Sequence, residues 1–263
     1  EHRPDQRRRR VVVAARDKLA EAVRLAPREH VGHVHAVRAE DDEHAVAGLL
    51  LRRPRVPRIV FGDEIREAWD HVDVLPFVGV VLNGGRSERM GTNKANLSLN
   101  GKTLLESSVL KLKKASASSI LIVGNALTEE FEIEVTVIKD LWPNEGPLGG
   151  ILTALQFLEG TELPVVIVAC DFPELDTEEI TNLVKHAYLN KDSIIVPRVG
   201  GVNQWMHSCW PTSSTEHLSK SFLGGERAPH RAVAGHEIVV LDRKNESAYF
   251  DVDTPEDFET VKI

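Results

Sequence analysis

Residues 78–94 read Val-Gly-Val-Val-Leu-Asn-Gly-Gly-Arg-Ser-Glu-Arg-Met-Gly-Thr-Asn-Lys, a short apolar run followed by a glycine-rich, basic loop. The paired glycines Gly84 and Gly85 allow a tight turn whose N–H groups can approach a phosphate chain. Arg86, Arg89 and Lys94 add positive charge within nine positions of Gly85. Many glycine-rich turns after a strand are purely structural, but three basic residues so close favour a loop that binds a triphosphate.

Two common phosphate-binding motifs do not match this loop. Lys94 is followed by Ala95 and not by the Ser or Thr of a P-loop, and the loop lacks the G-x-G-x-x-G pattern of dinucleotide-binding folds. The loop therefore needs a different explanation from either motif.

Outward from the loop, short apolar runs alternate with amphipathic stretches from Phe77 to the C-terminus. The apolar runs are 78–82, 120–123, 135–138, 164–169, 193–196 and 238–241, and the helical candidates are 104–114, 150–158, 177–189 and 255–261. Runs this short and apolar suit strands that are buried on both faces. The alternation predicts an α/β fold with a mostly parallel central sheet and helices on both faces. Ligands of such sheets bind beyond the carboxyl ends of the strands.

The composition changes near residue 77, and we expect a boundary there between an N-terminal extension (1–76) and the α/β domain (77–263). The extension is rich in Arg, His, Ala and Val, with helical spacing in residues 19–25, and it holds more than half of the eleven histidines. A metal site at His30, His33 and His35 is one reading. Without a cysteine or a spaced acidic partner, a solvated surface is the better one. The sequence gives the extension no role.

Charge and cysteine content narrow the class of protein. A net charge of −8 argues against general nucleic-acid binding, which needs a basic surface. Cys170 and Cys209 lack the spacing of a zinc site and are typical of a reducing compartment. No run approaches the roughly 18 apolar residues of a membrane span, and the apolar residues 11–15 are too few for a signal-peptide core. We therefore expect a cytoplasmic protein with no nucleic-acid or membrane partner.

Two acidic segments suggest a metal site. Asp171 ends the apolar run 164–169 after Cys170, and a carboxylate there is costly unless it is paired, with a metal ion as the usual partner. Asp251 and Asp253 fall on one side of an extended segment, and Thr254 looks like the N-cap of a helix. Mg²⁺ takes one or two protein carboxylates together with substrate phosphates, so we expect Mg²⁺ on Asp171 and Asp253. The alternative for Asp171 is a simple helix cap.

The loop resembles the signature of the molybdenum cofactor guanylyltransferase family, which belongs to the nucleotidyltransferases with a Rossmann-like fold. The resemblance covers residues 77–263, with four motifs in the expected order. It implies that Leu82, Asn83 and Gly84 contact a guanine nucleotide and that Lys94 holds its phosphates. The chain departs from the family at Asn93, where Asp is usual.

A second motif of the family lies at residues 140–151, where a Pro/Gly turn leads into a helix. By itself this could be an ordinary loop before a helix start. The resemblance implies that Asp140 contacts the nucleotide and that Gly146 and Pro147 border its pocket. The remaining candidates for nucleotide or acceptor binding are Gly85, Asn125, Asp171 and Gln204.

The acceptor side is less well marked. The resemblance implies that Gln204 meets a pterin, since an amide suits a flat heterocycle. Trp205 and Met206 depart from the Pro-Leu that the family usually has there. Arg227 could contact an acceptor phosphate or be a solvated charge.

The resemblance implies transfer of GMP from GTP to molybdopterin, with release of pyrophosphate. Lys94, Arg86 and Arg89 would be the catalytic residues, with Mg²⁺ as cofactor. Molybdoenzyme apoproteins or cofactor-delivery proteins would be further partners.

Three alternatives stay open. A molybdopterin cytidylyltransferase usually has a Ser-rich segment in place of residues 146–151, and a sugar-phosphate nucleotidyltransferase usually has G-x-G-T-R in its loop. A nucleotide-binding regulator without turnover would explain Asn93, Trp205 and Met206 and the unfamiliar extension.

Overall fold

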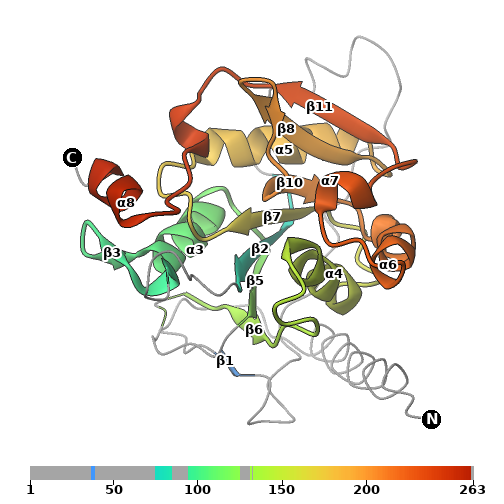
Figure 1. The fold of residues 1–263 in the computed structure, drawn as a ribbon, viewed down its shortest axis with the longest axis horizontal. Coiled ribbons are helices and arrows are strands. Elements are labelled where there is room, and N and C mark those ends of the chain that lie inside the picture. Colours follow the sequence, from blue (N-terminus) through green and yellow to red (C-terminus); the bar gives the residue numbers. More distant parts are fainter. Residues whose placement is uncertain (1–36, 39–74, 85–93, 125–130, 132, 262–263) are drawn as a thin grey trace.

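The computed structural model of the chain describes residues 37–38, 75–84, 94–124, 131 and 133–261 (Figure 1). Most of the expected N-terminal extension lies outside these residues, including His30, His33 and His35, so the boundary near residue 77 stays a prediction. Of the extension, β1 (Val37–Arg38) pairs in parallel with β6 (Thr136–Ile138) at the edge of the sheet.

The described strands form a nine-stranded sheet around β2, the strand that precedes the glycine-rich loop. The spatial order is β1-β6-β5-β2-β7-β10-β8-β11, with β9 paired to β8. Besides β1 and β6, its strands are β2 (Val78–Asn83), β5 (Ser119–Gly124), β7 (Val165–Ala169), β8 (Ile194–Val199), β9 (Val202–Asn203), β10 (His207–Trp210) and β11 (Ile238–Asp242). Strands β1, β6, β5, β2 and β7 run parallel, as do β8 and β11. The mostly parallel sheet and each predicted strand are confirmed.

Helices cover both faces of this sheet. On one face, α3 (Leu104–Lys114) and α5 (Thr177–Leu189) bury Leu112 and Leu183 against alternate strand residues such as Val81. On the other face, α4 (Pro147–Phe157), α6 (Thr215–Leu223) and α7 (Pro229–Ala232) pack on residues such as Leu82. Figure 1 shows α3 and α4 on opposite sides of β2. The expected α/β layers are therefore present, and β2 lies between two cores.

β10 is the main departure from the predicted fold. It lies between β7 and β8, runs antiparallel to both, and is buried along its whole length. Its sequence, His-Ser-Cys-Trp, has none of the branched aliphatic residues that mark the other strands. Its polar Ser208 is tolerated in the core because the hydroxyl donates to Trp205 O (2.6 Å) and accepts from Trp210 Nε1 (2.7 Å). The pattern of apolar runs could not reveal such a strand.

The helix ends follow local capping chemistry. Thr103 and Glu106 form a capping box at the start of α3, just after the small hairpin of β3 (Ser98–Leu99) and β4 (Lys102–Thr103). α4 begins at Pro147, not at Gly150 as predicted, because proline suits the first helical position. α8 (Pro255–Val261) has the predicted bounds, and Thr254 Oγ1 accepts from Asp257 N (3.2 Å), as expected for its cap. Across the described residues, no helix combines the length and apolar character needed to cross a membrane.

Candidate active site

Two adjoining cavities open at the carboxyl ends of β2 and β7. The first, here called the carboxylate cavity, has a volume of about 200 Å³ and is lined by Asn83, Lys94, Asp171 and Asp251 among others. The second, here called the turn cavity, has a volume of about 290 Å³ and is lined by Val123, Asp140, Asn144, Gly146 and Gly150 among others. Both cavities share Leu82, Gly84, Pro147 and Met206. They therefore form one cleft, at the sheet edge where α/β folds bind ligands.

Lys94, which lines the carboxylate cavity, lies between the carboxylates of Asp171 and Asp253. The Lys94 ammonium, in η1 (Lys94–Asn96), forms a short ion pair with Asp253 Oδ1 and lies 3.6 Å from Asp171 Oδ2. The Lys94 side chain is only 14% exposed, whereas Asp253 is 42% exposed. A lysine with so little exposure needs anionic partners, which here are carboxylates and in a complex could be phosphates.

The backbone brings these residues together from distant parts of the chain. Asp171 lies two residues after the end of the buried strand β7, and its carbonyl accepts a hydrogen bond from Val252 N (2.9 Å). Val252 is fully buried between α3 and α8, so Asp251 and Asp253 on either side of it point away from that core. Asp257 Oδ2 holds the segment by accepting from Asp253 N (3.0 Å) and Thr254 N (2.8 Å). The expected placement of Asp251 and Asp253 on one side is consistent with these contacts.

Asp171 offers a carboxylate oxygen that could coordinate a cation. Its Oδ1 is buried and accepts no hydrogen bond from the described residues. Burial raises the pKa of this carboxyl, the nearby Asp251 and Asp253 raise it further, and Lys94 opposes them. No three His, Cys, Asp or Glu side chains of the described residues form a metal cage. The arrangement suits an ion such as Mg²⁺, which takes most of its ligands from phosphates and water.

The turn cavity is walled by the segment 140–147. Asp140 Oδ1 accepts from Trp142 N (2.9 Å) and from Thr153 Oγ1 of α4 (2.9 Å). Glu145 N donates to Trp142 O (3.1 Å), which closes a turn in which Asn144 has a φ of +64°. Pro followed by Asn suits the central positions of such a turn. Asp140 thus fixes the wall through one oxygen, and its Oδ2 faces Gly84 across the cleft.

Most of the predicted site residues in the described chain line this cleft. They are Leu82, Asn83, Gly84, Lys94, Asp140, Gly146, Pro147 and Asp171. Asp253 joins them through Lys94. Gly85, Arg86, Arg89 and Asn125 lie outside the described residues. The sequence motifs therefore identify both cavities, although the basic residues of the loop remain predictions.

The acceptor side differs from the expectation. Gln204 is absent from the linings of both cavities, and its amide donates to Val202 O (3.3 Å). Met206, two residues later, lines both. Asp251 and Asn144 also line the cleft although neither was a predicted site residue. Asp251 had a usable signal, since it alternates with Asp253, whereas Met206 and Asn144 had none.

Behind the carboxylate cavity lies a buried histidine. The His207 ring makes an edge contact with Phe172, the residue after Asp171 (centroids 3.9 Å apart), and lies near Tyr249 (5.9 Å). Neither of its nitrogens has a hydrogen-bond partner among the described residues. Burial, and secondly the charge of Lys111, lower the pKa of His207 to about 3. The folded protein therefore keeps this imidazole neutral in the core.

We expect His207 to make the protein sensitive to acid. Below about pH 6.5 the unfolded chain takes up a proton that the buried ring does not take up until about pH 3, so the free energy of unfolding should fall by up to about 1.4 kcal/mol per pH unit from this group. His207→Leu, which leaves no unpaired nitrogen, should flatten this slope in urea denaturation between pH 7 and pH 4.5. His230→Leu, at an exposed position, is the control and should keep the native slope. Equal slopes in the native protein and His207→Leu would contradict the expectation.

Comparisons with known proteins agree with this architecture. A family model described as the MobA-like NTP transferase domain matches residues 79–239. A relative from Bacillus cereus strain Q1, named "Probable molybdenum cofactor guanylyltransferase", is 32% identical over 133 residues, which are 49% of this chain and 64% of that protein. A relative of the same name from Carboxydothermus hydrogenoformans is 41% identical over 99 residues, which are 37% of this chain and 48% of that protein. The chain thus spans about half to two thirds of the length of these curated relatives.

Solved structures share the fold. Molybdopterin-guanine dinucleotide biosynthesis protein A from Archaeoglobus fulgidus superposes with a TM-score of 0.59 at 21% identity, over 71% of this chain and 97% of that one. The 2-C-methyl-D-erythritol 4-phosphate cytidylyltransferase from Thermus thermophilus gives a TM-score of 0.53 at 16% identity, again over 71% of this chain and 97% of that one. At these identities the likeness concerns the fold alone.

Proposed function

The chain belongs to the MobA-like NTP transferase family, and from this we propose that it transfers GMP from GTP to molybdopterin, releasing pyrophosphate and forming the guanine dinucleotide form of the molybdenum cofactor. The single observation that carries the proposal is the cleft itself, where Lys94 lies between two aspartates at the ends of β2 and β7. The curated relatives' names support guanine as the base and the molybdenum cofactor as the product.

In the proposed reaction, a phosphate oxygen of molybdopterin attacks the α-phosphorus of GTP. A new P–O bond forms, the bond between the α-phosphorus and the bridging oxygen breaks, and pyrophosphate leaves. The acceptor phosphate is already anionic, so no general base is needed. Catalysis then consists of positioning and charge neutralisation. Lys94 would hold the departing phosphates, together with Arg86 and Arg89 of the loop.

We propose that Asp171 and Asp253 hold a divalent cation, Mg²⁺, which when bound neutralises phosphate charge and draws electrons from the α-phosphorus. Support comes from Asp171 Oδ1, a buried oxygen without a donor among the described residues. In the free protein the Lys94 ammonium supplies positive charge to the same two carboxylates. A triphosphate would give Lys94 a new anionic partner and free both carboxylates for the ion.

The two cavities suggest how the substrates divide the cleft. The carboxylate cavity suits phosphates and their cation. The turn cavity suits the base, with Leu82, Asn83, Gly84, Asp140, Gly146 and Pro147 around the nucleotide and Gly85 and Asn125 as further contacts. Met206, which borders both cavities, would face the pterin, and Gln204, two residues earlier and outside both linings, is the proposed amide contact. We propose that molybdoenzyme apoproteins or cofactor-delivery proteins receive the product. We place the reaction in the cytoplasm, because the free thiols of Cys170 and Cys209 are compatible with a reducing compartment.

Pyrophosphate release tests this function. The full chain is incubated with molybdopterin, Mg²⁺ and GTP, CTP, ATP or UTP in turn, and we expect release with GTP that depends on molybdopterin. Release with CTP alone would favour a cytidylyltransferase. Pyrophosphate release that requires a sugar phosphate in place of molybdopterin would favour a sugar-phosphate nucleotidyltransferase. Nucleotide binding without pyrophosphate release with any acceptor would favour the regulator.

A further inference from the structure

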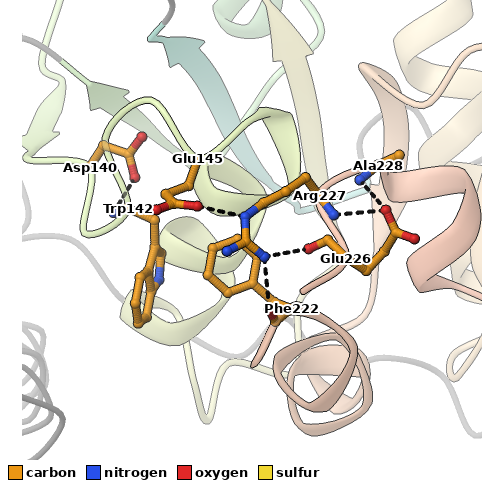
Figure 2. A network of polar contacts seen from close by, with 7 residues as sticks. All are labelled: Asp140, Trp142, Glu145, Phe222, Glu226, Arg227 and Ala228. Atoms are coloured by element: carbon orange, nitrogen blue, oxygen red, sulfur yellow. Dashed lines mark hydrogen bonds and ion pairs between the residues drawn. The ribbon is translucent and has the colours of Figure 1, made fainter. Parts of the chain in front are cut away.

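An ion pair between Glu145 and Arg227, here called the brace, supports the wall of the turn cavity from outside the cleft. Figure 2 shows Arg227, in the loop between α6 and α7, reaching across to Glu145. Arg227 Nε donates to Glu145 Oε2 at 2.6 Å, although the two residues are 82 positions apart. Glu145 lies between Asn144 and Gly146, both of which line the turn cavity. The ion pair therefore acts directly on that wall.

Arg227 is itself held in place on several sides. Its Nη1 donates to Phe222 O (2.8 Å) and Glu226 O (2.9 Å), and its guanidinium lies over the Phe222 ring, 4.1 Å from the centroid. The Phe222 ring packs on Trp142, with centroids 5.0 Å apart. The backbone N–H of Trp142 in turn donates to Asp140 Oδ1, as Figure 2 shows. These contacts form a chain that runs from Asp140 through Trp142, Phe222 and Arg227 to Glu145.

The backbone of Arg227 also supports the wall. Gly146 has a φ of +80°, and a Cβ built on it would lie 3.3 Å from Arg227 O and 3.4 Å from Arg227 Cβ. Gly146 precedes Pro147, where α4 begins without a side-chain cap. The entry into α4 thus touches Arg227 on one side and the cleft on the other. A shift of Arg227 would move cavity-lining atoms.

We propose that the Glu145–Arg227 pair positions the nucleotide: by fixing segment 140–147, it sets the affinity for the guanine nucleotide and the discrimination between bases. The proposal rests on the proposed function and concerns the same cleft. The guanidinium of Arg227 is engaged with Glu145 and Phe222 and is therefore not simply a solvated charge, whereas a contact with an acceptor phosphate stays a prediction.

Because the Arg227 and Glu145 side chains are partly exposed, their effect on nucleotide binding can be measured separately from their effect on the stability of the fold. Arg227 and Glu145 side chains are 39% and 47% exposed, and ion pairs this exposed contribute little to the free energy of unfolding. The contacts of Arg227 with Phe222 and Glu226 do not involve Glu145, so we expect them to persist when Glu145 is truncated. Loss of the carboxylate should therefore loosen the wall without unfolding the domain.

Glu145→Ala in the full chain tests the inference. We expect fluorescently labelled GTP to bind roughly fivefold more weakly, with the KM for GTP raised to the same degree, kcat within about twofold of native, and a smaller preference for GTP over ATP. Glu145→Gln keeps an acceptor for Arg227 Nε and should lie between native and Glu145→Ala. The matched control is Glu216→Ala, which breaks the exposed Lys220–Glu216 pair on α6 (2.8 Å) and should leave binding unchanged.

The outcomes distinguish the brace from the proposed function. If native protein binds labelled GTP and Glu145→Ala binds it equally well with the same base preference, the brace inference is wrong. A fall in kcat at unchanged KM would also overturn it. If native protein binds no nucleoside triphosphate, the proposed function fails instead. Should Glu145→Ala fail to fold, Arg227→Lys, which keeps the charge but loses the planar fork, carries the same test and the same expected rise in KM.

Discussion

Lys94→Ala should lower pyrophosphate release by about a thousandfold, the largest effect that we expect from a single substitution. The Lys94 ammonium lies near the carboxylates of Asp171 and Asp253. In the proposed reaction it binds the phosphates of the leaving group instead. Without it, the negative charge that develops on pyrophosphate has no ammonium partner. The measurement is turnover with GTP, Mg²⁺ and molybdopterin at saturating concentrations.

The same variant has a second readout that does not depend on turnover. Removal of the ammonium leaves Asp171 and Asp253 without their shared cation, so Mn²⁺ or Mg²⁺ alone should raise the Tm of Lys94→Ala more than that of native protein. Lys113→Ala, at an exposed position near the end of α3, is the matched control and should behave as native in both assays. Turnover above a tenth of the native rate in Lys94→Ala would rule out the assigned role.

Asp171→Asn should also abolish transfer, yet leave the protein at least as stable as before. The buried carboxyl has a raised pKa, so above its ordinary pKa of about 4 the ionised form costs folding free energy that a neutral amide does not. Transfer should fail because an amide is a poor ligand for the cation compared with a carboxylate. Thermal denaturation and pyrophosphate release, measured on the same preparation, separate the two effects.

Asp176→Asn is the control for this substitution. Asp176 Oδ1 accepts from Glu178 N (3.1 Å) at the start of α5, and the amide oxygen of Asn can make the same cap. We expect native turnover from it. A large fall in Tm with Asp171→Asn, or retained turnover, would contradict the role given to Asp171.

The fold was largely predictable because its strands and helices carry regular apolar patterns. Helices α3, α5 and α8 have the predicted bounds, and their local caps explain why. α6 was missed because Leu218 and Phe222 are its buried residues, too few in nine positions to reveal a period. β10 was missed because its core residues are His, Cys, Ser and Trp.

The site was predictable where its residues lie within two positions of a strand's end, as with Gly84 after β2 and Asp171 after β7. The Glu145–Arg227 pair could not be predicted, since each residue looks like an ordinary surface charge and only tertiary packing joins them. The same holds for Met206, whose place in the cleft depends on the unexpected strand β10. Local motifs therefore identify the residues that would contact the substrates, whereas contacts between distant loops determine the shape of the cleft.

The pairing of Lys94 with Asp253 has a consequence for the newly made protein. The two residues are 159 positions apart, so Lys94 emerges from the ribosome long before Asp253 is synthesised. A nascent chain that already contains β2 and the buried strand β7 still lacks the acidic segment that Val252 anchors beside Asp171. The cleft is thus completed only after Asp253 has been synthesised, and a shorter nascent chain would lack one of the two proposed ligands for the cation.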